Sequence, residues 1–270
     1  MLFFYRNKTV FSKKDFKLFL IKEKENRSNS IVNFNLINKF FPNYYGYPNE
    51  TTTPLHVACY YAIQFSCTDI MKILIQCGAN VNIQDNKGVT PLMICQFYKH
   101  NYPVMKLLID NNANVCIKDI KDNTILHKYR NFCIEDIDDI LLESLLNMGI
   151  NIDKRNDRGY TPLMNLIYHY MHRSFISLLI NHGADMNIIN NEGDTPLLMA
   201  CKTGNYDLAQ ALIEGGADVN IGDREGNTPL IIAFCEKNYT SLGRLFKYLI
   251  GHGADVNKAN HKGETPMHMA

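Results

Sequence analysis

The fold is decided by residues 191–226, which read NEGDTPLLMACKTGNYDLAQALIEGGADVNIGDREG. Thr195 can cap a helix that begins at Pro196, because the first helical turn leaves backbone N–H groups unpaired and proline has none to lose. A second helical pattern follows, and Gly216 can close it at positive φ without steric cost. The residues up to Gly226 then have the composition of a turn. This stretch therefore predicts two short helices followed by an extended turn.

The same pattern recurs along most of the chain. The threonine that would begin each unit is found at Thr53, Thr90, Thr124, Thr161, Thr195, Thr228 and Thr265. Successive spacings are 37, 34, 37, 34, 33 and 37 residues. Glycine closes the second helix in most repeats. In the second repeat it is replaced by Asn112, a residue type that also tolerates left-handed backbone. Units that bury their apolar faces only against neighbours form one elongated array.

These motifs resemble a known repeat. Thr-Pro-Leu-His-x-Ala, a pair of aliphatic residues, Gly-Ala-Asp-Val-Asn and Asp-x-x-Gly together are similar to the ankyrin repeat, and the resemblance runs from about Thr53 to Ala270. It implies an all-α fold, an ankyrin-repeat α-solenoid of stacked helix-turn-helix units with β-hairpin-like fingers. Several near-complete copies make the resemblance specific.

The ends of the chain match the repeat less well. We interpret residues 1–49 as a degenerate N-terminal capping repeat or basic arm, with nine Lys/Arg against three Asp/Glu, a net charge of +6 that leaves −5 for the remainder. Residues 50–270 form the array, with about six full repeats and a truncated last repeat that starts near 260. The final six residues are too short to shield the surface beneath them, so we expect either a poorly capped end or a fragment of a longer product.

Some units depart from the repeat. The three spacings of 37 exceed the usual ~33 by about four residues. We place this excess between the two helices of a unit, at 62–67, 132–136 and 236–241. In the third repeat, Ile125 replaces proline, and Asp122 followed by asparagine replaces the glycine turn.

The sequence offers no residues for catalysis. His56, His127 and His268 occupy a position that holds methionine, leucine or isoleucine in other units, so the position is structural, and the resemblance implies hydrogen bonds between units. Phosphate-binding loops, nucleophile elbows and paired metal-ligand motifs are absent from the sequence. The eight cysteines are dispersed, which favours reduced thiols over disulfides or zinc ligands. We therefore predict no catalytic, cofactor-binding or metal-binding residues, and no cofactor.

An aromatic stripe gives the candidate binding site. By the resemblance, the residues seven and eight positions after each threonine point into a concave groove that binds partners. Four consecutive units place aromatic or histidine side chains there, and the candidate partner-binding residues are Tyr60, Tyr61, Phe97, Tyr98, Phe132, Tyr168 and His169. The next unit has Lys202 instead. An alternative left open is that the longer inter-helix loops cover these rings.

The resemblance implies a non-catalytic protein–protein interaction module, an adaptor or scaffold that binds a protein partner through the concave groove and the finger tips. The composition is similar to that of ankyrin proteins of large DNA viruses such as poxviruses, with intracellular bacteria and protists as alternatives. If the chain is a fragment, the resemblance also implies the substrate-recognition part of a ubiquitin-ligase adaptor. Two further alternatives are anionic-ligand or nucleic-acid association through the basic arm and an inert structural spacer.

The location follows from the absence of targeting signals in the sequence. The opening apolar residues 1–5 are too short for a signal peptide, and no apolar run approaches the length of a membrane span. We expect a monomer in the cytoplasm, or in the host cytoplasm if the protein is viral, with the nucleus as an alternative. We expect neither membrane association nor a small-molecule substrate.

Overall fold

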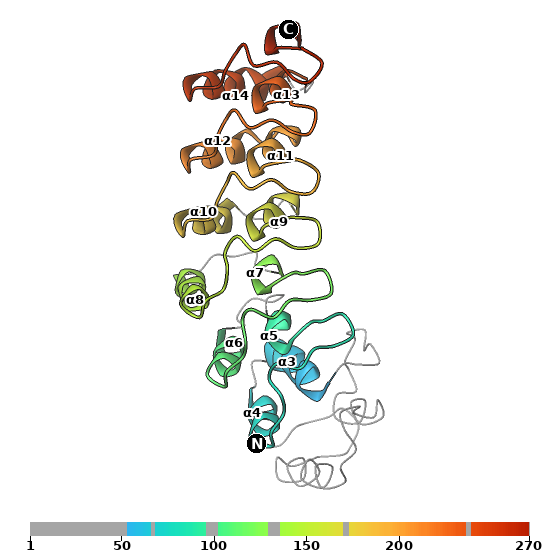
Figure 1. Cartoon of the computed structure of the whole chain (residues 1–270). Coiled ribbons are helices and arrows are strands. Elements are labelled where there is room, and N and C mark those ends of the chain that lie inside the picture. The colour runs from blue at the N-terminus through green and yellow to red at the C-terminus, as the bar shows by residue number, and fades with distance from the viewer. Residues whose placement is uncertain are drawn as a thin grey trace. The chain divides into compact units, whose positions relative to one another are not determined.

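A computed structural model describes residues 53–65, 68–95, 102–128, 136–169, 173–235 and 239–269. The chain divides into two compact units, Met1–Ile120 and Lys121–Ala270. Figure 1 shows the described helices of each unit. The predicted capping repeat at 1–49 lies outside the described residues. The predicted boundary between 1–49 and 50–270 stays a prediction.

The first unit contains two helix pairs among its described residues. Its helices are α3 (Pro54–Phe65), α4 (Asp69–Gln76), α5 (Pro91–Ile94) and α6 (Tyr102–Ile109). Helix α3 packs on α4 and on α5, and α5 packs on α6. The core between these helices includes Leu55, Met71 and Met105, each exposed by 1% or less. Such burial provides the main stabilisation of a stacked pair.

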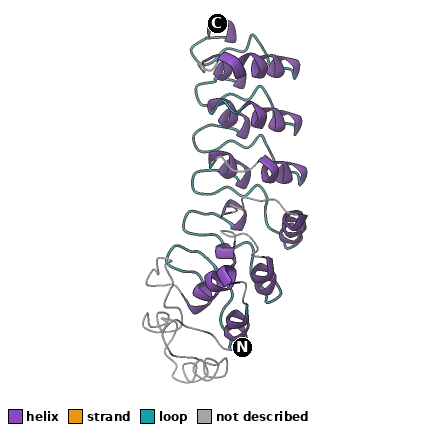
Figure 2. Cartoon of the chain, turned by 180° about the vertical axis from the view of Figure 1, so that it is seen from behind, coloured by secondary structure: helices purple, strands orange, loops and turns teal. Residues whose placement is uncertain are grey.

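The second unit continues the same arrangement. Its elements are α7 (Ile125–Lys128), α8 (Asp136–Asn147), α9 (Pro162–Tyr168), α10 (Arg173–Asn181), α11 (Pro196–Lys202), α12 (Tyr206–Glu214), α13 (Pro229–Cys235), α14 (Tyr239–Gly251) and the 3₁₀ helix η2 (Pro266–Met269). Helix α11 packs on α9, α12 and α13, so first helices stack on first helices (Figure 1). The described residues contain helices and turns without strands, which confirms the predicted all-α class (Figure 2).

The first helices begin where the threonine–proline pairs predict. Thr161 Oγ1 accepts a hydrogen bond from Met164 N at 3.3 Å, and Thr195 Oγ1 accepts one from Leu198 N at 3.2 Å. Proline follows each of these threonines at the first helical position. The predicted N-caps are therefore confirmed in the two repeats that begin at Thr161 and Thr195.

Left-handed backbone closes the second helices. Gly183 and Gly216 have φ of 82° and 101°, and Asn112, which replaces glycine in the second repeat, has φ of 64°. Asp122, which stands in place of the turn glycine, also has a positive φ, 58°. Both substitutions therefore keep the backbone of the repeat, at the conformational cost of placing a side chain in this region.

The position predicted for the extra residues was wrong in part, because several of them lengthen helices. Among first helices, α3 has 12 residues whereas α9 and α11 have seven. Among second helices, α8 has 12 and α14 has 13, whereas α10 and α12 have nine. Residues 62–65, expected in a loop, form the last turn of α3. Helical extension satisfies backbone N–H and C=O groups that a loop would leave to water. Tyr60 and Tyr61 therefore lie within α3 and not at its end.

We call the turn after each second helix a finger. In the second unit the fingers extend past the first helices, on the side away from α10, α12 and α14 (Figure 2). Neighbouring fingers are joined by backbone bonds, such as Asn191 N to Arg158 O at 3.0 Å and His261 N to Glu225 O at 2.8 Å. The predicted fingers are thus held together without regular strands among the described residues.

Buried histidines join successive repeats. His127 Nδ1 accepts from Thr124 N at 3.1 Å, so its proton lies on Nε2, which donates to Tyr160 O at 3.0 Å. In the first unit, His56 Nε2 lies 2.9 Å from Val89 O. The structural role implied for this position by the resemblance is confirmed for both side chains.

We expect the first unit to lose stability in mild acid through His56. Burial lowers the pKa of His56 below its ordinary value of 6.5, although the hydrogen bond to Val89 opposes this shift. The unfolded chain therefore binds a proton first, and stability falls as the pH drops below 6.5, by at most about 1.4 kcal/mol per pH unit. Urea denaturation of the wild type and of His56→Met between pH 7.5 and 5 tests this. Equal pH dependence in both proteins would contradict it.

Candidate functional site

The predicted stripe is only partly within the described residues. Tyr60 is half-buried on α3, and the side chain of Tyr61 lies outside the described residues. Three further candidates also lie outside them, namely Phe97, Tyr98 and Phe132. The stripe as a whole therefore stays a prediction. Its described members in the second unit are Tyr168 and His169, at the end of α9.

Tyr168 is the centre of an aromatic and cationic cluster. Its side chain is 46% exposed, whereas that of Tyr160, whose ring it contacts edge-on at a centroid distance of 5.6 Å, is 2% exposed. The ring of His169, which is also exposed, lies 5.1 Å away and edge-on. The Arg158 guanidinium carbon lies 5.5 Å from the Tyr168 ring centroid. The cluster thus has a buried base and an exposed upper surface, held by ring and cation–π contacts.

The electrostatics of the cluster follow from this arrangement. Burial raises the pKa of Tyr160, and the negative charge of Glu192 raises it further while Arg158 lowers it. A hydrogen bond with Tyr168 raises the pKa of the Arg158 side chain. At neutral pH the cluster therefore presents a neutral Tyr160 beside the permanent positive charge of Arg158.

The finger that carries Arg158 is fixed by its neighbour. Asn191 N donates to Arg158 O at 3.0 Å, and Asn191 Nδ2 donates to Asp157 O at 2.9 Å. Arg155 Nη2 donates to Asn191 Oδ1 at 3.0 Å. These three bonds hold the backbone that positions Arg158. The sequence does not single out Arg158, because its contact with Tyr168 depends on the return of the chain after the turn.

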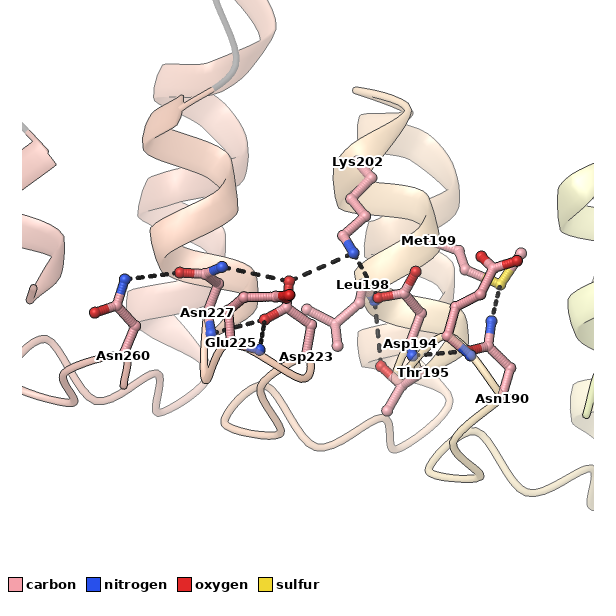
Figure 3. A network of polar contacts seen from close by, with 11 residues as sticks. Asn190, Asp194, Thr195, Leu198, Met199, Lys202, Asp223, Glu225, Asn227 and Asn260 are labelled. Carbon is pink, nitrogen blue, oxygen red and sulfur yellow. Dashed lines mark hydrogen bonds and ion pairs between the residues drawn. The ribbon is translucent and has the colours of Figure 1, made fainter. Parts of the chain in front are cut away.

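A polar network surrounds Lys202 at the end of α11 (Figure 3). Lys202 Nζ lies 2.6 Å from Asp194 Oδ1 and 3.4 Å from Asp223 Oδ2. The lysine side chain is 40% exposed, whereas those of Asp194 and Asp223 are 9% and 4% exposed. Burial lowers the pKa of Lys202, but the hydrogen bond and charge of the two carboxylates outweigh this effect and raise it above its ordinary value. Lys202 is therefore a charged bridge between two fingers.

The network continues through amide side chains. Asn227 Nδ2 donates to Asp223 Oδ2 at 3.4 Å, and Asn260 Nδ2 donates to Asn227 Oδ1 at 2.9 Å (Figure 3). Asn190 holds the position of Asp223 one repeat earlier and of Asn260 two repeats earlier, and its Nδ2 faces the thioether sulfur of Met199 at 4.0 Å. The network therefore runs from α11 toward the C-terminal end of the unit.

The comparisons with known proteins agree with this architecture. A family model described as ankyrin repeats in three copies matches residues 20–119 and 132–223, and a model of a single ankyrin repeat matches residues 225–261. The matched segments make up well over half of the chain. The chain belongs to the ankyrin repeat family. Ankyrin repeats generally act as protein–protein interaction modules, which confirms the predicted general class of function.

Curated relatives include viral ankyrin proteins. An ankyrin repeat protein of Fowlpox virus (strain NVSL) is 29% identical over 151 residues, covering 53% of this chain and 43% of the relative. Ankyrin repeat protein B18 of Variola virus is 29% identical over 170 residues, covering 53% of this chain and 28% of the relative. The matches thus span less than half the length of these relatives. The predicted similarity to poxvirus ankyrin proteins is confirmed.

A solved structure supports the ankyrin fold. The crystal structure of the ankyrin repeat domain of Bcl-3, a member of the IkappaB protein family, aligns with a TM-score of 0.66 at 24% identity. The alignment covers 81% of this ankyrin chain and 94% of the Bcl-3 chain. At this identity the match shows the shared fold.

The described residues of this ankyrin chain include no cluster of three or more histidine, cysteine, aspartate or glutamate side chains that could hold a metal ion. No helix in the described ranges has the length and apolar character needed to cross a bilayer.

Asparagine side chains at the start of the fingers join successive ankyrin repeats. Asn82 Nδ2 donates to Asn112 O at 3.2 Å, and Asn220 Nδ2 donates to Gly253 O at 3.0 Å. In another repeat the residue at this position is Asp153, which has no amide donor. Burial raises the pKa of Asp153 above its ordinary value of 3.8, the hydrogen bond from Asp185 N lowers it, and the charge of Asp185 raises it again.

We expect Asp153→Asn to stabilise the second unit by about 0.5–1 kcal/mol at pH 7, because it restores the amide donor that Asn82 and Asn220 provide at this position and removes a charge near Asp185. The folded chain holds a proton on Asp153 more readily than the unfolded chain. Wild-type stability at this site therefore rises as the pH falls through the folded pKa, and the advantage of Asp153→Asn shrinks. Urea denaturation at pH 7 and pH 4 tests this. A constant or negative difference would contradict it.

Proposed function

We propose that this chain is a non-catalytic adaptor or scaffold that binds a segment of a partner protein along the concave face of its ankyrin units. In the second unit this face includes the end of α9 and the neighbouring finger. The observation that carries the proposal is Tyr168, a large ring that is 46% exposed and yet held in place by Tyr160 and Arg158. Tyrosine and arginine are enriched in binding hot spots, and an ordered ring loses little entropy on binding.

The source of the partner is part of the same proposal. The relatives are ankyrin proteins of poxviruses, which supports a role in an infected cell. We propose that the partner is a host protein and that binding takes place in the host cytoplasm. The candidate residues Tyr60, Tyr61, Phe97 and Tyr98 of the first unit, and Phe132 of the second, stay predicted partner-binding residues.

The test is capture of partners from host-cell lysate, followed by measurement of Kd for a captured protein. We expect Tyr168→Ala to weaken binding by about 2 kcal/mol, a factor of about 30, because it removes a hot-spot ring. We expect little change in the denaturation midpoint, since the ring is nearly half exposed. The combined replacement of Tyr61, Tyr98 and Tyr168 by alanine should abolish capture.

Tyr206→Ala is the matched control. Tyr206 is a half-buried tyrosine on α12, in edge contact with Tyr248 at 6.1 Å, and its loss should leave Kd unchanged. Reduced stability of Tyr168→Ala with unchanged binding would show that the ring serves packing. Failure of the intact chain to capture any protein would instead favour the structural spacer.

A further inference from the structure

Two cationic side chains of the second unit, Lys202 and Arg158, differ in their surroundings. The Lys202 ammonium lies within 4 Å of two carboxylates, those of Asp194 and Asp223. Arg158 forms no ion pair with any described residue, and its guanidinium lies over the Tyr168 ring. A carboxylate from a partner would therefore compete with two internal acids at Lys202, whereas at Arg158 it would meet an uncompensated charge.

The finger around Arg158 has further positive charge. Lys154 and Arg155 precede it in the same turn, together with two acids, Asp153 and Asp157. Arg155 donates to an amide oxygen, not to a carboxylate. Asp153 Oδ1 accepts from Asp185 N at 2.9 Å, so this acid is directed toward the next finger. The Asp157 charge acts on Arg158 through space without forming an ion pair. The tip therefore keeps a positive character.

The orientation of Arg158 is preset. Its backbone is tied to the next finger through Asn191 N, and its side chain rests on Tyr168. A guanidinium has five N–H donors in a planar fork that matches a carboxylate in a bidentate pair. The ring contact and the hydrogen bond with Tyr168 leave further N–H donors of the guanidinium available.

We infer that Arg158 and Tyr168 together recognise an aspartate or glutamate in an extended segment of the partner protein. The carboxylate would accept two hydrogen bonds from Arg158, and the methylene groups of the segment would lie on the exposed part of the Tyr168 ring. This inference rests on the proposed function, because it assigns a chemical preference to the same surface. By the same inference, Lys202 holds the fingers together through Asp194 and Asp223 and does not bind the partner.

The test is selection of binders from a displayed library of random 12-residue peptides, using the full chain as bait. We expect the selected peptides to be enriched in aspartate and glutamate. For a selected peptide, changing its key glutamate to glutamine should weaken binding to the wild type by about three- to tenfold. The same change should have almost no effect on binding to Arg158→Gln. Arg158→Lys, which keeps the charge and loses the fork, should give an intermediate effect.

Arg244→Gln is the matched control, because Arg244 is an exposed arginine on α14 with no ion pair among the described residues. It should select the same peptides as the wild type and show the full effect of glutamate to glutamine. Peptides without acidic enrichment, whose binding still requires Tyr168, would overturn the inference and leave the proposed function standing. A preference for phosphoserine over glutamate of more than about a hundredfold would overturn the carboxylate in favour of a phosphate. Recovery of no peptide at all would overturn both.

Discussion

Replacing Lys202 with methionine is expected to destabilise the second unit by about 2–3 kcal/mol. Methionine keeps the length of the aliphatic chain, so the change removes the charge without opening a cavity. Asp194 and Asp223, whose side chains are 9% and 4% exposed, would then be two neighbouring carboxylates without their shared cation. Breaking a fully buried ion pair costs about 3–5 kcal/mol, and the 40% exposure of Lys202 reduces this value. Urea denaturation followed by circular dichroism measures the loss.

The control removes the two acids together with the lysine. Asparagine can replace Asp223, because Asp223 Oδ1 accepts from Asn227 N at 2.9 Å, the same bond that Asn190 Oδ1 accepts from Asp194 N at 2.8 Å. The triple variant Lys202→Met, Asp194→Asn, Asp223→Asn should therefore recover most of the lost stability. If Lys202→Met alone costs less than about 0.5 kcal/mol, the bridge behaves as an ordinary surface pair. Failure of the triple variant to recover would mean that packing of the lysine stem, not charge, is responsible.

The sequence predicted the features that depend on neighbouring residues. The caps at Thr161 and Thr195, and the left-handed backbone at Asn112, are decided within a few positions of each residue. The stacking of repeats followed from their regular spacing, because each unit can bury its apolar face only on another unit. Local rules and a simple repeat thus determine most of this fold.

The contacts that define the candidate site join side chains that are separated in the sequence, and the repeat pattern does not indicate which side chains meet. Lys202 bridges Asp194 and Asp223, which belong to successive fingers, and nothing near Lys202 in the sequence indicates both partners. The cation over Tyr168 comes from Arg158, ten positions earlier and beyond the turn. The extra residues were assigned to loops because insertions usually fall there, but α3 and α14 gained helical hydrogen bonds instead. Side-chain partners across the finger therefore required the structure.

Replacing Gly159 with alanine is expected to cost about 3 kcal/mol, because two penalties coincide there. Gly159 has φ of 73°, which costs a residue with a side chain about 1–2 kcal/mol. A Cβ at this position would also lie 2.7 Å from Asn191 N, a backbone atom of the next finger, so the two fingers must separate. Steric overpacking of this kind adds about 1–3 kcal/mol. Urea denaturation provides the measurement.

Gly183→Ala separates the two penalties. Gly183 has a similar φ of 82°, but a Cβ there would have no atom within 4 Å, so its replacement should cost only about 1 kcal/mol. Gly159→Ala should also weaken the bond from Asn191 N to Arg158 O and speed hydrogen exchange at Asn191, whereas Gly183→Ala should not. Equal costs for the two variants would show that close contact between fingers contributes little. In that case the finger backbone could not be the element that presets Arg158 for its partner.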